Sequence, residues 1–367
     1  RQQDAVPDTI IYNAAISACG QGGAWEVALS LLRSAATRHL RPSAVTYSAA
    51  INSCAACEQH WQVAMLLLAE VQQSRIELNA IMCSATISAC GSDEQWQLAL
   101  WLLGEVQVQR LETDIIPYNA AISTCEKAGQ WIWAVHVLSD LQRRGFEPDV
   151  STYSAAISAC ESAVQWDAAL QLLRDLVLKG LVPDVITCSA AISACEKGEQ
   201  WELALWLLGG AQHQCLTLDV IIYNAAISAC EKGKQWAVAL SLLVKMRRWK
   251  HIPDTITYGA AISACEKGAQ WEWALRIVKE TQEQQLAPEI ISYSAAISAC
   301  GKCKHWERAL VILAEMETQN VQPNVISYNA AISACEKGGQ WERALSMLIE
   351  MQKHRAQDVI SYNAVLL

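Results

Sequence analysis

Two short turns of this chain combine side chains that commonly bind zinc in proteins. The first holds Cys300, Cys303, His305 and Glu307, and the second holds Cys54, Cys57 and His60. Thiolates and imidazoles are zinc ligands, and a Cys-x-x-Cys pair can also be redox active. Zinc deaminases, however, place His-x-Glu far upstream of Cys-x-x-Cys. The first turn has the reverse order and a very short spacing. We therefore predict no metal site.

Other catalytic patterns are absent from the sequence. The chain contains no phosphate-binding glycine loop and no His-Glu-x-x-His motif, and its seven histidines are scattered. We therefore predict a protein without a cofactor and without enzymatic activity.

Most of the fifteen cysteines follow a fixed period, which is unusual for ligands or disulfide partners. The spacing is 35 residues, apart from one step of 36, at Cys19, Cys54, Cys90, Cys125, Cys160, Cys195, Cys230, Cys265, Cys300 and Cys335. A buried free thiol behaves as a small apolar side chain. We interpret these cysteines as packing residues in a reducing compartment.

The same period divides the whole chain into repeats. Counted from Thr9, the units are 9–43, 44–79, 80–114, 115–149, 150–184, 185–219, 220–254, 255–289, 290–324 and 325–358. Residues 1–8 end a preceding repeat, and 359–367 begin an eleventh. Below, place one denotes the first residue of a unit. An uninterrupted array of this period predicts a solenoid.

Each unit shows two helical patterns. In the last complete unit, the first apolar face consists of Tyr328, Ala331, Ile332 and Cys335 at i, i+3, i+4 and i+7. After a glycine-containing turn, Trp341, Ala344, Leu345, Leu348 and Met351 form the second face. A proline before the final residue ends most units. We predict an all-α fold, a right-handed superhelical α-solenoid of about ten 35-residue helix-turn-helix repeats.

A tryptophan begins every second helix of the array. These residues are Trp25, Trp61, Trp96, Trp131, Trp166, Trp201, Trp236, Trp271, Trp306 and Trp341. A row of indoles could stack nucleic-acid bases. Because each tryptophan is in register with the apolar face of its helix, we favour packing in the core.

Composition limits the functional classes. The chain has 367 residues, 52% hydrophobic and 18% charged, with a net charge of −9. It contains no run of about 18 apolar residues, so we predict no membrane-spanning helix. The negative charge gives no global attraction to nucleic acid.

The repeated motif resembles the pentatricopeptide repeat family. The resemblance rests on Tyr-Asn/Ser in the first helix, a Glu-Lys-Gly turn, an Ala-Leu second helix and a closing Pro-Asp, and it covers about 360 residues. The wording "AAISACEKG" is also similar to such repeats in dinoflagellate algae. The resemblance implies a non-catalytic protein of the chloroplast or mitochondrion that binds single-stranded RNA, one base per repeat, in RNA processing, stability or translation.

In this family, the base is chosen mainly by the fifth and the final residue of each repeat. Here the pairs are Asn13/Ser43, Ser48/Asn79, Ser84/Asp114, Asn119/Asp149, Ser154/Asp184, Ser189/Asp219, Asn224/Asp254, Gly259/Glu289, Ser294/Asn324 and Asn329/Asp358. The family rule then implies the sequence C-A-G-U-G-G-U-x-A-U from 5′ to 3′. The eighth base is unassigned because Gly259 has no side chain.

Two further places fit an RNA groove. Place two is apolar in nine of ten units, and residues expected to sandwich bases are Ile186, Ile221, Ile256, Ile291 and Ile326. Place thirteen carries candidate phosphate ligands, namely Lys127, Lys197, Lys232, Lys267, Lys302 and Lys337. Four units lack this lysine, which leaves the first half of the array with a poor phosphate track.

A second functional class remains open at the level of sequence. The array could be a scaffold or structural subunit of a large organellar protein complex that does not use RNA. The negative net charge and the mean hydropathy of +0.13 favour the scaffold. The ordered pairs at places five and final favour RNA, because a protein scaffold does not need them.

Overall fold

Every regular element in the described part of the chain is an α-helix. The computed structural model describes residues 9–353 apart from 23, 38–41, 56–60, 75, 92–94, 109–113, 214–217, 285, 287 and 320. Twenty helices occur there, two in each predicted unit. The predicted base-reading residue Asp358 and the start of the eleventh repeat lie outside these residues.

The helices alternate between two sets. The first helices are α1 (Thr9–Gln21), α3 (Ala44–Ala55), α5 (Ala80–Gly91), α7 (Ile116–Lys127), α9 (Val150–Ser162), α11 (Val185–Lys197), α13 (Val220–Lys232), α15 (Thr255–Lys267), α17 (Ile290–Lys302) and α19 (Val325–Lys337). The second helices are α2 (Trp25–Thr37), α4 (Trp61–Gln73), α6 (Trp96–Val108), α8 (Trp131–Arg143), α10 (Trp166–Leu178), α12 (Trp201–His213), α14 (Trp236–Arg248), α16 (Trp271–Glu283), α18 (Trp306–Thr318) and α20 (Trp341–Lys353).

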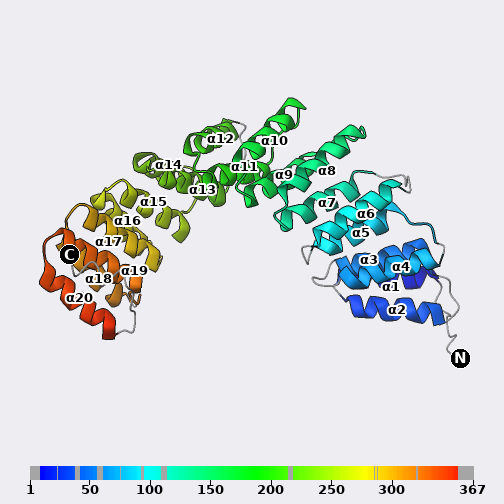
Figure 1. Ribbon diagram of the computed structural model, residues 1–367, viewed down its shortest axis with the longest axis horizontal. Helices are drawn as coiled ribbons and strands as arrows, with labels where there is room; N and C mark the ends of the chain where they lie inside the picture. The colour runs from blue at the N-terminus through cyan, green and yellow to red at the C-terminus, as the bar shows by residue number, and fades with distance from the viewer. Residues whose placement is uncertain are drawn as a thin grey trace. The chain divides into compact units, whose positions relative to one another are not determined.

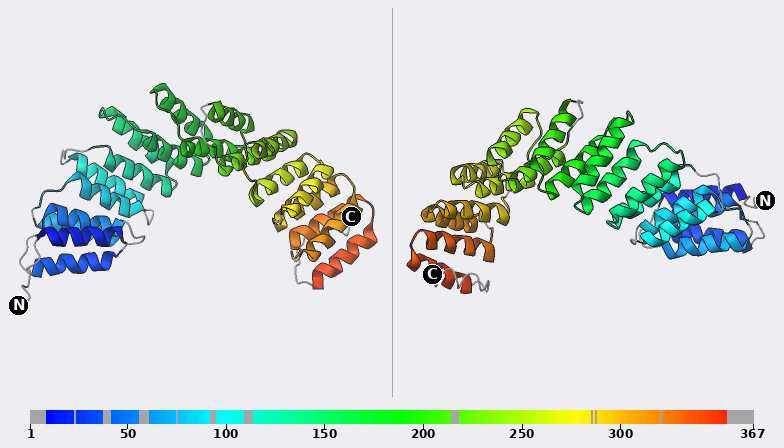
Figure 2. Two further views of the ribbon diagram at one scale, coloured as in Figure 1. Left: turned by 180° about the vertical axis from the view of Figure 1, so that it is seen from behind. Right: turned by 45° about the horizontal axis from the view of Figure 1, so that its top comes forward.

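The hairpins stack by the same contacts in both compact parts of the chain, 1–194 and 195–367. In the second part, α13 packs against its partner α14 and against α15 of the next repeat, which α14 also contacts. In the first part, α3 packs in the same way against α4 and α5. Figures 1 and 2 show these successive hairpins within each part. The prediction of a helical-repeat α-solenoid is confirmed.

The core repeats with the helices. In the seventh unit, Tyr223, Ile227 and Cys230 of α13 and Ala239 and Leu243 of α14 are at most 3% exposed. The tyrosine hydroxyl reaches a polar neighbour, since Gln212 Nε2 of the preceding unit donates to Tyr223 Oη at 3.1 Å. Burial of these apolar faces between units is therefore the main stabilising contribution.

The tryptophans that begin the second helices pack between repeats. Nine of the ten are half-buried, whereas Trp341 is exposed. The ring of Trp236 lies against the turn of the next unit, where a Cβ added to Gly268 would come within 2.4 Å of Trp236 Cδ1. The tryptophans therefore contribute to inter-repeat packing, although they are less buried than the tyrosines and isoleucines.

In units four to ten, the turn between the two helices contains one residue with a left-handed backbone. In the fifth unit, Gln165 N donates to Cys160 O at 2.8 Å, which closes the end of α9. The residue before Gln165 is Val164, and its φ is +60°. At the matching place, Gly129 and Gly339 have φ of +64° and +68°. Valine is poorly suited to this conformation, because its branched Cβ crowds the backbone.

We expect Val164→Gly to stabilise the protein. The substitution removes a left-handed strain of about 1–2 kcal/mol but adds flexibility to the unfolded chain, so the net gain is expected to be about 0.5–1 kcal/mol. Urea unfolding would measure it. Gly339→Ala is the matched reverse change and should destabilise. A Val164→Gly variant that unfolds at lower urea concentration than the parent would contradict this account.

The turn that holds Cys300, Cys303 and His305 has ordinary packing contacts. Cys300 is buried, and Cys303 Sγ donates to Ala269 O at 3.2 Å. The His305 ring lies 4.4 Å from that of Trp271, centroid to centroid. Within the described residues, no three His, Cys, Asp or Glu side chains are arranged to hold a metal ion. Cys57 and His60 lie outside them.

None of the helices described in the structure is both long and apolar enough to cross a membrane.

Candidate nucleic-acid interface

A row of exposed isoleucines follows the first helices. At place two, Ile186, Ile221, Ile256, Ile291 and Ile326 are 63–68% exposed. Place two precedes the buried residue at place four by two residues, and this residue is Cys188 in the sixth unit and tyrosine in the other four. On a helix, this spacing turns place two about 200° away from that side chain. These five isoleucines are therefore exposed to solvent.

A pocket of about 450 Å³ opens between the first helices of units eight to ten. Ile291 and Ile326 both line it, together with the predicted base-reading pair Ser294 and Asn324. Ser298, at place nine, lines it as well. Apolar side chains and hydrogen-bonding groups thus meet in one hollow, an arrangement that suits a flat heterocycle with a polar edge.

The final residue of most units caps the first helix of the next unit. Asp254 Oδ1 accepts from Thr257 N at 2.8 Å at the start of α15, and Asn324 Oδ1 accepts from Ser327 N at 3.0 Å at the start of α19. The same cap forms at Asn79, Asp149, Asp184 and Asp219. Asp114 Oδ1 accepts from Ile116 N. A structural role therefore accounts for part of the residue preference at this place.

The final place departs from this pattern in two units. Glu289 precedes α17 without a side-chain cap hydrogen bond. Ser43 Oγ lies 3.2 Å from Thr46 Oγ1, and Ser43 N donates to the same threonine oxygen.

The fifth and final residues of a predicted pair can contact each other directly. Asn224 Nδ2 lies 3.1 Å from Asp254 Oδ1 and 3.2 Å from Asp254 Oδ2. Asn79 Nδ2 lies 3.5 Å from Ser48 Oγ. Burial would raise the pKa of Asp254, but the hydrogen bonds from Thr257 and Asn224 outweigh it and lower the pKa. Asp254 is therefore ionised at neutral pH.

Asparagines at place five accept a hydrogen bond from the next unit. Thr46 Oγ1 donates to Asn13 Oδ1 at 2.6 Å, and Thr152 Oγ1 lies 2.7 Å from Asn119 Oδ1. Thr257 Oγ1 likewise contacts Asn224 Oδ1, and it also lies 2.7 Å from Asp254 Oδ1. The repeat pattern alone did not single out these threonines, although each follows a unit with asparagine at place five.

Serines at place five use their hydroxyl proton within their own helix. Ser48 donates to Ala44 O at 2.7 Å, Ser84 to Ile81 O at 3.0 Å and Ser294 to Ile290 O at 2.8 Å. The serine oxygen then acts mainly as an acceptor, and Ser294 Oγ also lies 2.8 Å from Ser327 Oγ of the next unit. Ser84, Ser154 and Ser294 are buried, whereas Ser189 and the asparagines are half-buried. Asparagine is therefore the more accessible type at this place.

Three of the predicted phosphate ligands are engaged in ion pairs between units. The Nζ atoms of Lys232, Lys267 and Lys302 lie 2.8, 2.9 and 3.0 Å from carboxylate oxygens of Glu196, Glu231 and Glu266. Each partner belongs to the preceding unit. Ser228 Oγ, at place nine, donates to Glu196 Oε1 at 2.9 Å and so contacts the same glutamate as Lys232. These pairs reduce the net positive charge of the groove.

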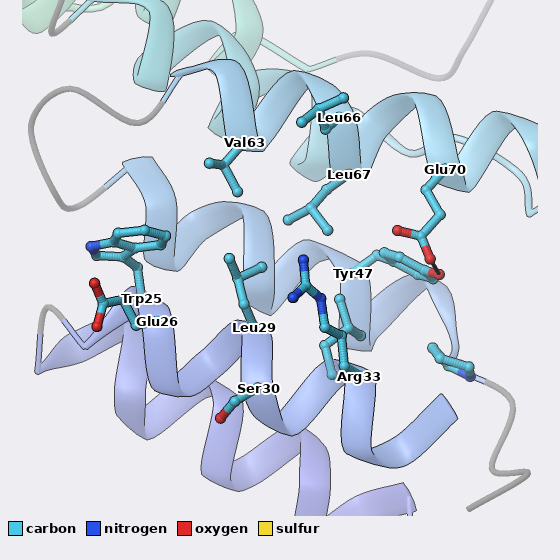
Figure 3. Close-up of a pocket in the computed structure, with 12 residues that line it drawn as sticks. Trp25, Glu26, Leu29, Ser30, Arg33, Tyr47, Val63, Leu66, Leu67 and Glu70 are labelled. Carbon is cyan, nitrogen blue, oxygen red and sulfur yellow. Dashed lines mark hydrogen bonds between the residues drawn. The ribbon is translucent and has the colours of Figure 1, made fainter. Parts of the chain in front are cut away.

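A larger hollow lies elsewhere, between α2 and α4. It has a volume of about 660 Å³ and is lined by Leu29, Leu66 and Leu67, among others. Figure 3 shows Arg33 and Glu70 at this hollow, where Tyr47 Oη donates to Glu70 Oε1 at 3.1 Å. It contains none of the predicted base-reading residues.

The fold of this chain is similar to that of solved pentatricopeptide repeat structures. The structure of the pentatricopeptide repeat protein PPR10 from maize is 21% identical with a TM-score of 0.59, covering 98% of this chain and 56% of that chain. PPR10 in complex with an 18-nt psaJ RNA element is 21% identical with a TM-score of 0.49, covering 99% and 52%. The chain thus aligns with little more than half the length of these structures. No curated protein sequence matches it.

Family models match most of the array. The PPR repeat family model matches residues 218–267 and 288–337. The pentatricopeptide repeat domain model matches 66–128, 136–198 and 253–303, and the PPR repeat model matches 10–35, 116–146 and 326–355. Together with the helical hairpins and their period, these matches show that the chain belongs to the pentatricopeptide repeat family.

Proposed function

We propose that this protein binds single-stranded RNA along the first helices, with one base at each repeat. The observation that carries the proposal is the pocket lined by Ile291, Ile326, Ser294 and Asn324. Two exposed isoleucines can hold the faces of a base, while the polar pair meets its Watson–Crick edge. Duplex RNA has no free edges of this kind, so it is not a ligand.

The charge and the hydrogen-bond donors of each place-five and final residue pair determine which base edge can bind to them. In unit seven, one amide hydrogen of Asn224 faces Asp254, and the other is free to donate to the O2 carbonyl of a pyrimidine. The ionised Asp254 can accept the N3–H of uracil. Cytosine presents a lone pair at N3 and is disfavoured. Uracil is therefore the best partner of this unit, in agreement with the sequence-based assignment.

The predicted ligand is an oligonucleotide containing C-A-G-U-G-G-U-N-A-U. We expect the purified chain to bind it at least about tenfold more tightly than a scrambled strand of equal composition, since correct base contacts are worth about 1–3 kcal/mol each in nucleic-acid readout. Fluorescence anisotropy at fixed ionic strength would measure both dissociation constants. The duplex of the same sequence is the control. Equal affinity for the matched and scrambled strands would contradict base-specific binding.

Lys232, Lys267 and Lys302, called the lysine ladder below, are expected to contribute equally to the affinity for every RNA sequence. Replacing both Lys232 and Lys267 by alanine removes two cations that can face phosphates, and it also leaves Glu196 and Glu231 without their partners. The double variant should weaken matched and scrambled strands by the same factor. The slope of log K against log salt should become shallower by about 0.7 per lost phosphate contact.

A cation on the opposite helix provides the control for this experiment. Lys245 is exposed in the last turn of α14, a second helix. Lys245→Ala changes the net charge without touching the ladder and should leave the salt slope unchanged. If the ladder variant and the Lys245 variant behave alike, the ladder lysines do not contact RNA.

The proposal also covers the cellular role of the protein and the compartment in which it acts. We propose a non-catalytic adaptor that protects or presents an RNA segment in a chloroplast or mitochondrion. Family membership supports this setting, and expression of the full-length gene product with a fluorescent tag would test it. A nuclear or cytosolic signal would contradict the organellar assignment without affecting RNA binding.

The scaffold alternative is favoured by one observation. Trp101 of α6 and Trp206 of α12 are 56% and 74% exposed on second helices, away from the isoleucine row. Exposed tryptophans are typical of protein interfaces. If the chain binds neither the matched nor the scrambled RNA at low salt, the scaffold becomes the better explanation.

A further inference from the structure

The amide of a base-reading asparagine is held in one orientation by a threonine of the next repeat. This contact occurs at Asn13, Asn119 and Asn224, whose Oδ1 atoms face Thr46, Thr152 and Thr257. All three threonines occupy place three of the following unit and are at most 1% exposed. Their hydroxyl groups therefore sit in a fixed position beneath the asparagine.

The surrounding groups determine which end of the amide faces the threonine. In unit seven, Asn224 Nδ2 lies within 3.2 Å of both carboxylate oxygens of Asp254. Rotating the amide by 180° would place Oδ1 against the ionised carboxylate, which is repulsive. In unit one, Thr46 accepts from Ser43 N, so its own proton is directed to Asn13 Oδ1. Both arrangements fix Oδ1 inward and leave Nδ2 as the accessible group.

Serine at place five has the opposite polarity. The hydroxyl protons of Ser48, Ser84 and Ser294 are directed to backbone carbonyls of their own helices, so the oxygen presents an acceptor. With a base seated as proposed above, a donor at place five can meet the O2 carbonyl that both pyrimidines carry, whereas an acceptor can meet the amino group of adenine or the N1–H of guanine. The hydrogen-bond partner of the place-five side chain thus sets whether that place offers a donor or an acceptor.

We infer that the place-three threonine is a specificity-determining positioning residue, which keeps asparagine at place five as a hydrogen-bond donor and so selects pyrimidines. This inference rests on the proposed RNA binding. The threonine itself does not touch the base. It acts through the asparagine, while the final residue then distinguishes uracil from cytosine.

Thr257→Val tests the inference, since valine keeps the shape and removes the hydroxyl. The measurement is the dissociation constant for four RNA strands that differ only at the seventh base. Asp254 still opposes a flipped amide, but Asn224 Oδ1 has lost its partner and the amide is held less firmly, so the preference for uracil over guanine should fall by up to about tenfold, the value of one lost hydrogen bond. Thr257→Ser restores the hydroxyl and should restore the preference.

Thr187→Val is the matched control for loss of a capping hydroxyl. Thr187 Oγ1 lies 2.6 Å from Asp184 Oδ1, much as Thr257 Oγ1 lies 2.7 Å from Asp254 Oδ1, but Thr187 follows a unit with serine at place five. It should destabilise the fold by a similar amount without moving any pyrimidine preference. Thr152→Val should repeat the effect at the fourth base only.

The outcomes separate this inference from the proposed function. If the parent chain binds no RNA, the proposed function fails. If the parent prefers uracil at the seventh base and Thr257→Val keeps the same ratio of dissociation constants, the threonine has only a capping role and the inference is wrong. Thermal unfolding of each variant checks that the chains compared are folded.

Discussion

The folded protein is expected to lose its helical structure between about pH 9 and pH 11. Burial raises the pKa of eight repeated or neighbouring thiols to about 11, or to about 12 at Cys125, namely Cys83, Cys125, Cys160, Cys188, Cys195, Cys230, Cys265 and Cys300. In the unfolded chain these thiols ionise near their ordinary pKa of about 8.5. The folded state therefore binds more protons in this range, and its stability falls as the pH rises.

The expected effect is large because many sites act together. One unit of pKa corresponds to about 1.4 kcal/mol, and a folded domain is stabilised by only about 5–15 kcal/mol. Ionisation of a few buried thiols is thus sufficient to unfold part of the array. Below the ordinary thiol pKa, the same groups are neutral in both states and stability should not depend on them. Far-ultraviolet circular dichroism during an alkaline titration with a thiol reductant would follow the transition.

Two variants identify the thiols as the cause. Replacing Cys230 and Cys265 by alanine should make the alkaline loss of stability shallower, because two of the raised pKa values are removed. Cys303→Ala, which removes a thiol that is only half-buried, is the comparison variant. The buried thiols should also react slowly with a labelling reagent at neutral pH. Unchanged helicity throughout the alkaline range, or rapid labelling of Cys230, would contradict this explanation.

The second large effect is expected at the seventh base. Asn224→Ser converts the Asn224/Asp254 pair to the Ser/Asp type found at Ser189/Asp219, which the family rule assigns to guanine. The serine hydroxyl can donate to the backbone of its own helix, as at Ser294, and then presents an acceptor. Preference should move from uracil to guanine, with a change in relative affinity of about 10- to 100-fold, or 1–3 kcal/mol.

The array offers an internal control for this change. Asn119→Ser in the fourth unit should shift preference only at the fourth base, since Asn119 contacts Thr152 in the same way as Asn224 contacts Thr257. Competition between strands that differ at one base would measure each shift. If both variants keep the base preferences of the parent, the residues at place five do not read RNA.

The period of the sequence was sufficient to predict the helices and the core. First helices begin at place one in nine units, and only α7 starts one residue later, at Ile116, where Asp114 accepts from its backbone N–H. The buried tyrosines, isoleucines and cysteines also follow from the helical spacing. The tryptophans were predicted less well, because the rings of Trp201, Trp236 and Trp306 lie against the turn of the next repeat, which a single-helix pattern does not show.

Contacts between repeats were the part that sequence patterns missed. Lys232 has a glutamate beside it in the chain, but it pairs with Glu196, 36 residues earlier. Such a pair depends on the rotation between successive hairpins, which periodicity does not specify. The role of Thr257 was hidden for the same reason. A signal was nevertheless present, since a hydroxyl residue at place three follows every unit with asparagine at place five.

The cap formed by the final residue has a consequence for how such arrays change during evolution or design. Asp, Asn and Ser are among the best N-cap residues, and replacing them by apolar residues costs about 1 kcal/mol. Nine of the ten final places hold one of these three residues, and the exception, Glu289, makes no cap hydrogen bond. Helix capping therefore limits the final place to a few residue types, whether or not a ligand is bound there. Exchanges among these residue types can change a binding preference while the repeats remain stacked.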